Sequence, residues 1–198
     1  MAYFKNILII QSLLLGIFAV TSGQKVKLTE CPTLTSDTSE KLTFANLVGT
    51  WKVIAATPSI HHPDWKCTTY TFNAITANSK YSIGISGRRP LFGTSYLSGT
   101  ATVTGVATDA STAWTYLTFD ITDGSKTYKW NYYIVLTDDD TFIALFACEP
   151  FLFGRIESFL LLAKSGVSST SVTTALDTVA NYGVTRSDLV YPHNAQCL

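Results

Sequence analysis

Short runs of β-prone residues, separated by turn residues, follow one another through most of the chain. In several runs bulky and small side chains alternate: Tyr70 and Phe72 alternate with threonines, and so do Trp114 and Tyr116. A period of two places the bulky residues on one face of a strand. The pattern predicts eight strands, at residues 51–57, 68–75, 80–87, 95–107, 113–120, 126–136, 141–148 and 157–163.

Most links between these runs have the length of hairpin loops, and Asp138-Asp139-Asp140 is one of them. Strands joined in this way predict an all-β domain, either an up-and-down antiparallel barrel or a sandwich. Large rings on one face would line the lumen of a barrel or fill the core of a sandwich. The pattern alone leaves both architectures open.

One amphipathic helix is predicted after the last strand, over residues 170–182. Val172, Leu176 and Val179 recur with helical spacing, and Gly183 follows them as a stop signal. We expect this helix to pack on the outside of the β domain.

The N-terminal segment has the pattern of a secretory signal peptide. Lys5 precedes an apolar run that ends in the small residues Thr21, Ser22 and Gly23. This pattern predicts a signal peptide at residues 1–23 and a secreted mature chain, residues 24–198, that folds as one domain. The apolar run is short for a membrane span, so no stable membrane insertion is expected; an uncleaved anchor is the alternative interpretation.

The charge balance narrows the classes of partner. The 198 residues include 14 basic and 14 acidic side chains, so the formal net charge is zero. Because the chain carries no excess of positive charge, neither nucleic acid nor an anionic membrane surface is expected as a partner.

Four cysteines are spread widely along the chain: Cys31, Cys67, Cys148 and Cys197. An even number of cysteines in a secreted chain, with no Cys-X-X-Cys pair, favours two disulfides over a metal site. Four cysteines allow three pairings, and their spacing does not choose among them.

Three stretches resemble the sequence motifs of the lipocalin family. Gly49-Thr50-Trp51 matches the Gly-X-Trp motif that opens the lipocalin barrel. Thr137 and Asp138, followed by a strand that ends in a cysteine, resemble the second motif.

Residues 155–164, which include the last predicted strand, resemble the third motif, and Lys164 stands where the family carries arginine. Asp139 likewise stands where the second motif has tyrosine. The resemblance implies an eight-stranded up-and-down antiparallel β-barrel with one C-terminal α-helix packed outside. It also implies a closed floor, in which Lys164 lies over the ring of Trp51. We expect the floor at Gly49, Trp51, Thr137, Asp138 and Lys164.

The resemblance also selects a disulfide pairing. In arthropod lipocalins and their apolipoprotein D-like relatives the first cysteine joins the third and the second joins the fourth. Transferred to this chain, that pattern predicts Cys31–Cys148 and Cys67–Cys197.

A barrel lined with rings would bind a hydrophobic small molecule, and the segment 148–154 resembles the carotenoid-binding crustacyanin subunits. The resemblance implies extracellular binding, storage or transport of a non-covalent ligand, with a carotenoid pigment as first choice. A bilin, a retinoid, or a fatty acid or pheromone are the alternatives, and a thiol-linked bilin is not expected because all four cysteines are assigned to disulfides. Homo- and heterodimers both remain open.

The alternation predicts which side chains line the lumen, with His61 and Trp65 in a loop at the mouth. The predicted ligand-binding residues are Val53, Ala55, Tyr70, Phe72, Tyr81, Trp114, Tyr116, Trp130, Tyr132, Phe142, His61 and Trp65.

Other chemistry is less well supported by the sequence. Adjacent His61 and His62 fall short of the three or four converging ligands that a metal needs, so no metal is expected. An enzyme would need a free cysteine or a converging acid and base, and the chain shows neither pattern, so no catalysis is expected. A protein-directed role, as an inhibitor or a storage protein without ligand, stays an alternative.

Overall fold

The structure is a computed structural model. It describes residues 26–32, 42–59, 65–89, 93–104, 116–151, 154–165, 167–193 and 197. The predicted signal peptide at residues 1–23 lies outside the described residues.

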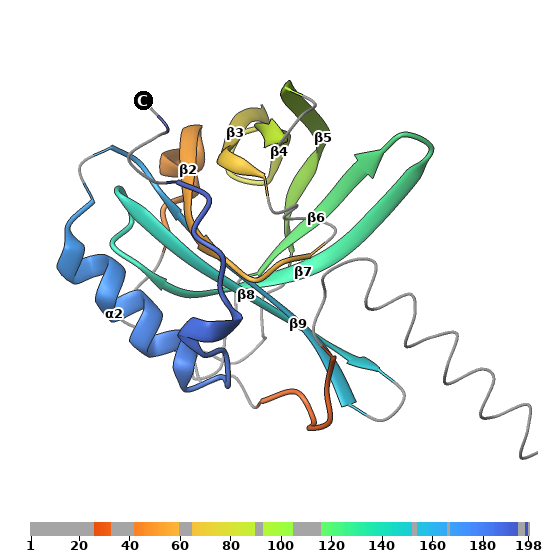
Figure 1. Ribbon diagram of the computed structural model, residues 1–198. Coiled ribbons are helices and arrows are strands. Elements are labelled where there is room, and N and C mark those ends of the chain that lie inside the picture. Colours follow the sequence, from red (N-terminus) through yellow and green to blue (C-terminus); the bar gives the residue numbers. More distant parts are fainter. Residues whose placement is uncertain are drawn as a thin grey trace, which may run out of the picture.

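Eight antiparallel strands of the described chain close into a barrel, and each after the first is hydrogen-bonded to the one before it. The ring closes where the last of them pairs with the first. Figure 1 shows the strands curving around a common interior. They are β2 (Gly49–Ala56), β3 (Lys66–Thr76), β4 (Lys80–Arg89), β5 (Gly93–Thr104), β6 (Tyr116–Asp123), β7 (Lys126–Thr137), β8 (Phe142–Phe151) and β9 (Gly154–Ala163). The barrel prediction is therefore confirmed and the sandwich is excluded.

A two-residue strand, β1 (Val26–Lys27), adds to the outside of this ring. It pairs with Arg155 and Ile156 near the start of β9, while the other end of β9 pairs with β2. The sequence pattern did not predict β1, because two residues carry no periodicity.

The helix α2 (Ser169–Ala180) follows the barrel and packs against its outer side (Figure 1). Its first turn is capped by Ser168, whose side-chain oxygen accepts a hydrogen bond from the backbone N–H of Ser171 at 3.0 Å. After the helix, Gly183 adopts a φ of +86°, a left-handed conformation that suits glycine. The helix prediction is confirmed, with ends that differ by one or two residues.

The barrel wall separates two hydrophobic clusters. The inner cluster lies on the lumen side and contains buried residues of all eight barrel strands. The outer cluster lies between the wall and α2, where Ala175, Leu176 and Val179 of the helix meet residues such as Phe146 and Phe159. Strands β8 and β9 are therefore buried on both faces, which explains their nearly continuous apolar sequences.

Both disulfides form as the resemblance implied. Cys31 is bonded to Cys148 and Cys67 to Cys197, with sequence separations of 117 and 130 residues. The first attaches the segment after β1 to β8, and the second attaches the C-terminal segment to the start of β3.

No helix within the described ranges is long and apolar enough to cross a membrane.

Candidate ligand-binding site

Buried rings line the inner face of the barrel. Six of the predicted ligand-binding residues belong to the inner cluster: Val53, Tyr70, Phe72, Tyr81, Trp130 and Tyr132. Trp65, which we expected in the mouth loop, also belongs to this cluster and is only 3% exposed. Two further predicted residues, Trp114 and His61, lie outside the described residues.

Three of the predicted lumen residues lie on the other side of the wall. Ala55 and Phe142 belong to the outer cluster beneath α2. Tyr116 packs its ring at 5.5 Å from Tyr133, which lies against the same outer cluster. The prediction that these residues face the lumen is therefore wrong.

Each of the three errors has a local physical cause. A register shift between Val53 and Ala55 interrupts the alternation of β2, as a β-bulge does. Phe142 begins a run that is apolar on both faces, so its periodicity gives no direction. In β6 the inward residues are Leu117, Phe119 and Ile121, one position out of step with Tyr116.

Two hydroxyl groups meet inside the apolar lumen. Tyr132 Oη and Ser158 Oγ lie 2.8 Å apart in a buried hydrogen bond. Burial raises the pKa of Tyr132, and burial together with the nearby Tyr132 raises the pKa of Tyr70. Both phenols are therefore neutral at physiological pH and present hydrogen-bonding oxygens without charge.

Sequence reasoning missed Phe119 and Ser158 as lumen residues. The sequence could have shown Phe119, because Leu117, Phe119 and Ile121 are apolar and alternate with the polar Thr118 and Asp120. It could not have shown Ser158, since a lone serine in an apolar strand carries no directional signal. Its pairing partner on β8, the inward Ala147, and its hydrogen bond to Tyr132 place it on the lumen side.

At the mouth, Trp65 occupies a space that a glycine leaves open. A Cβ on Gly87 would lie 2.8 Å from Trp65 Cβ, closer than side chains approach. The guanidinium of Arg89 lies 5.2 Å from the centroid of the Trp65 ring, within the range of a cation–π contact. Gly87 and Arg89 follow Ile85 on the inward face of β4, so Arg89 is the inward residue nearest the mouth on that strand.

At the opposite end, a 3-10 helix, η1 (Phe44–Leu47), covers the floor. Trp51 is fully buried, and its ring N–H donates to the carbonyl of Leu47 at 2.7 Å. Lys164 Nζ lies 4.7 Å from the centroid of the Trp51 ring and donates to the carbonyl of Asn46 at 3.0 Å. The predicted contact of Lys164 with Trp51 is present, and Gly49 enters the strand with a φ of +120°.

The residue that replaces the family's tyrosine has a role of its own at the floor. Asp139 accepts hydrogen bonds from the backbone N–H and the hydroxyl of Thr43 and from the side-chain amide of Asn46. The hydroxyl of Tyr81 donates to the carbonyl of Phe44 at 2.8 Å. Side chains from β4 and from the β7–β8 turn therefore fasten η1 across the end of the barrel.

The β7–β8 turn is organised by Asp138. Partial burial of this largely exposed carboxylate opposes its ionisation, but hydrogen bonds from the Thr141 side chain and from the N–H groups of Phe142, Thr141 and Asp140 lower its pKa overall. Thr137 Oγ1 donates to the carbonyl of Phe142 at 2.7 Å. Thr137 and Asp138 thus close the turn that supports the floor.

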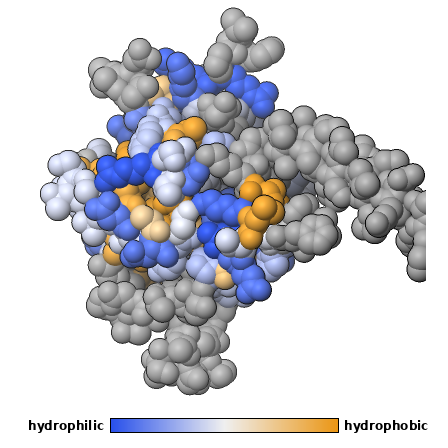
Figure 2. Space-filling view, turned by 60° about the horizontal axis from the view of Figure 1, so that its bottom comes forward, coloured by the Kyte–Doolittle hydropathy of each residue, from blue (hydrophilic) through white to orange (hydrophobic). Residues whose placement is uncertain are grey.

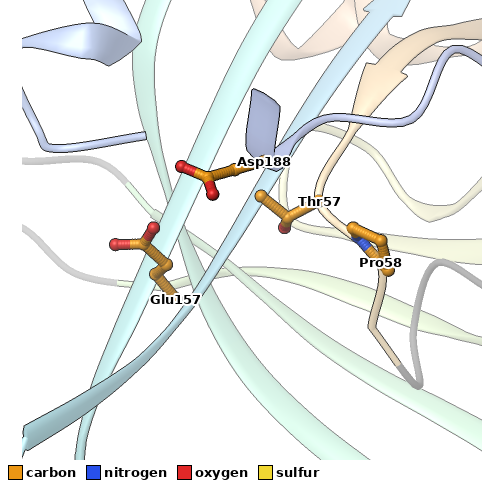
Figure 3. A pocket seen from close by; sticks show the side chains of 4 residues that line it. All are labelled: Thr57, Pro58, Glu157 and Asp188. Atoms are coloured by element: carbon orange, nitrogen blue, oxygen red, sulfur yellow. The ribbon is translucent and has the colours of Figure 1, made fainter. Parts of the chain in front are cut away.

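A small hollow on the outside of the barrel is lined by Thr57, Pro58, Glu157 and Asp188 (Figure 3). Its two carboxylates are held by one cation: Lys27 Nζ contacts Glu157 and lies 3.3 Å from Asp188 Oδ2. This arrangement joins β1, β9 and the C-terminal 3-10 helix η2 (Arg186–Asp188). We interpret this ion-pair cluster of Lys27, Glu157 and Asp188 as a clamp: it holds β1 and the segment around η2 against the barrel.

Arg155 extends this clamp. Its guanidinium lies 3.0 Å from a Glu157 oxygen and donates to the carbonyls of Glu30 and Tyr182. A buried glutamate between two cations is compensated in charge, which is the condition under which such a group is tolerated.

The exposed hydrophobic side chains of the described chain come from separate elements: Leu28, Val48, Ile75, Tyr96 and Tyr191. Figure 2 shows one face of the molecule, on which hydrophobic residues lie in separate groups among hydrophilic ones. Among the residues that the structure places, no group of three or more His, Cys, Asp or Glu side chains is arranged to hold a metal ion.

No family model and no curated protein sequence matches the chain. Solved structures do match. Apocrustacyanin C2 is 15% identical with a TM-score of 0.67, over 87% of this chain and 93% of that one. Insecticyanin from the tobacco hornworm, Manduca sexta, is 16% identical with a TM-score of 0.64, over 88% of this chain and 91% of that one.

A biogenic amine-binding protein is 16% identical with a TM-score of 0.58, over 82% of this chain and 86% of that one. At such identities the likeness concerns the path of the chain, and that path is the same over most of each protein. The chain therefore has the lipocalin fold: a closed eight-stranded antiparallel barrel with one extra strand outside and a single helix after it.

Proposed function

We propose that the protein binds, stores or transports a hydrophobic small molecule outside the cell, in the lumen of the barrel. The observation that carries this proposal is the inner wall of buried rings, with the neutral hydroxyls of Tyr132 and Ser158 among them. Apolar surface transferred from water to such a wall contributes about 25 cal/mol per Å². A few hundred Å² of buried ligand would therefore support binding even after the ordering terms are subtracted.

An extracellular location agrees with the two disulfides, which persist in oxidising compartments. The signal-peptide pattern at residues 1–23 supports the same location. The structural neighbours supply a precedent for small-molecule binding, because one of them is named for binding biogenic amines.

For the ligand we propose a carotenoid. The support is the resemblance of residues 148–154 to crustacyanin subunits and the ring-lined wall, which suits a flat polyene. Hydroxyl groups such as that of Tyr132 suit a ligand with terminal oxygens. A bilin, a retinoid or a fatty acid would use the same wall, so the test has to compare them directly.

The test is a titration of the mature chain, expressed in an oxidising compartment, with astaxanthin, biliverdin, retinol and a fatty acid. Tryptophan quenching and visible absorption report binding. We expect astaxanthin to bind at micromolar concentration or better with a shifted spectrum. Trp130→Ala should weaken binding, because Trp130 belongs to the inner cluster. Tyr116→Ala is the matched control and should leave binding unchanged, since Tyr116 packs outside.

Each outcome has one meaning. If none of the four ligands quenches the tryptophans, the binding function is wrong and a protein-directed role becomes the better interpretation. If only another ligand binds, the carotenoid choice alone is wrong. If Tyr116→Ala weakens binding as much as Trp130→Ala, the ligand does not occupy the lumen.

A further inference from the structure

Side chains from four strands meet in a continuous layer across the middle of the barrel. The ring of Phe119 on β6 lies 6.4 Å from Tyr70 on β3 and 4.9 Å from Tyr132 on β7. Tyr132 is hydrogen-bonded to Ser158 on β9. Because β3 and β7 are four strands apart in a ring of eight, they stand on opposite walls. We call Tyr70, Phe119, Tyr132 and Ser158 the cross-barrel layer.

The space on the floor side of this layer is filled. Phe72 packs 6.1 Å from Phe119, and its backbone pairs with Gly49, at the start of β2 and below Trp51. All four residues of the layer and Phe72 have no exposed surface. A side chain without exposed surface touches no space large enough for a water molecule, so these five side chains are closely packed on all sides.

On the mouth side of the layer, the inner wall includes residues with some exposed surface. Trp130 lies two residues nearer the open end of β7 than Tyr132, stacks on it at 6.3 Å and is 8% exposed. Leu97 in the mouth-side half of β5 and Ile156 near the mouth end of β9 border the inner cluster and are partly buried. Val103 and Ile134 are also partly buried, but they lie toward the floor, away from the opening. Apolar surface available to a ligand therefore lies between the mouth and the cross-barrel layer.

We propose that the cross-barrel layer is the inner end of the ligand site and that Phe119 sets the length of apolar chain that the barrel accepts. This inference rests on the proposed function and adds a depth limit to it. Phe119 links the rings of the β3 wall to Tyr132 of the β7 wall, so it is the bridging member of the layer. A ligand that reached deeper would have to displace packed rings, which well-packed interiors resist.

The experiment uses saturated linear alcohols from octanol to octadecanol, which differ only in chain length. Their affinities for the disulfide-bonded mature chain are measured by calorimetry. While the tail still gains wall contacts, each added CH2 group should raise affinity about fourfold. Once the tail reaches the layer, further CH2 groups remain in water and the affinity should stop rising.

Phe119→Ala should move this plateau to a longer alcohol, because the removed ring opens the layer. Phe146→Ala is the matched control: it removes an equally buried ring, but one that stacks on Tyr182 in the outer cluster, and should leave the plateau in place. If Phe119→Ala does not fold, Phe119→Leu takes its place; it removes less of the side chain and should shift the plateau by less. Tyr132→Phe keeps the ring and should keep the plateau.

An affinity that rises steadily to octadecanol in the wild type would overturn the depth limit and leave the binding function standing. A plateau that moves equally in Phe146→Ala would show that stability, and not depth, controls it, and would also overturn the inference. If no alcohol binds and none of the four ligands quenches tryptophan, the binding function fails together with this inference.

Discussion

The two ends of the barrel use the same pair of groups in different settings. At the floor a cation lies over Trp51, and at the mouth a cation lies over Trp65, at 4.7 and 5.2 Å. At the floor Lys164 also donates a hydrogen bond to one backbone carbonyl of η1, and the ring N–H of Trp51 donates to a second carbonyl of η1. At the mouth Arg89 is exposed, and its guanidinium lies over the ring of Trp65.

The two ends differ in the number of hydrogen bonds that join separate elements of the fold. The floor residues belong to a network that joins η1, β2, β9 and the β7–β8 turn. The mouth pair depends on the fit of one ring into the space above Gly87. We infer that the floor stabilises the fold, whereas the mouth is the end that opens to a ligand. Four predictions sharpen or break this contrast, and they follow from the largest expected effect to the smallest.

Trp51→Ala should destabilise the protein by about 3–5 kcal/mol, as truncation of a core aromatic residue does. Trp65→Ala should cost clearly less, because Trp65 lies at the open end, where solvent can enter the space that its ring leaves. Chemical denaturation of both variants measures the two free energies of unfolding. Equal losses would show that the mouth is as rigid a part of the core as the floor.

Gly87→Ala should destabilise the protein by about 1–3 kcal/mol, because the new methyl group overlaps Trp65 Cβ and the ring has to move. A red shift of tryptophan emission should accompany the loss as Trp65 becomes wetter. Gly84→Ala on the same strand is the control, since a Cβ there meets nothing within 4 Å. If both variants behave alike, the space above Gly87 does not hold Trp65.

Lys164→Met should cost about 1–2 kcal/mol, because it leaves the carbonyl of Asn46 without its donor and removes the cation over Trp51. Arg89→Met should change stability by about 0.5–1 kcal/mol, as expected for an exposed cation–π pair. Thermal unfolding of both variants compares the two cations. A larger effect for Arg89→Met would reverse the assignment of the rigid end.

The floor and most of the lumen residues on β7 could be predicted from the sequence, whereas the facing of Phe142 could not. The Gly49-Thr50-Trp51 motif and Lys164 predicted the floor, because the resemblance supplied their contact. Alternation placed Trp130 and Tyr132 correctly, since β7 has a polar outer face there. It failed at Phe142, where α2 makes the outer face as apolar as the inner one.

The short elements η1 and β1 form because of tertiary contacts, and no periodic pattern in the sequence predicts them. The four-residue η1 follows from hydrogen bonds that its carbonyls accept from Trp51, Tyr81 and Lys164, each on a different strand or its end. Strand β1 follows from its pairing with β9 and from the ion pairs of Lys27. The cross-barrel layer is likewise invisible in the sequence, because Phe119 and Ser158 become neighbours of Tyr132 only when the barrel closes.

The smallest effect should come from the charge of Asp138 in the floor turn. Its pKa is lowered in the folded protein, so its contribution to stability is present at pH values above its ordinary pKa of about 4. That contribution is lost as the pH falls through the lowered, folded-state pKa. Because the carboxylate is largely exposed, water screens it, and we expect less than about 1 kcal/mol at neutral pH.

Asp138→Asn keeps one side-chain oxygen for the N–H groups of the turn and removes the charge. The free energy of unfolding of the wild type should exceed that of the variant at neutral pH. The difference should then shrink as the pH falls below about 4, because the protonated wild type resembles the variant. Subtracting the two pH profiles removes the titration of all other groups. A difference that stays constant down to acid pH would show that the turn depends on the shape of Asp138 and not on its ionisation.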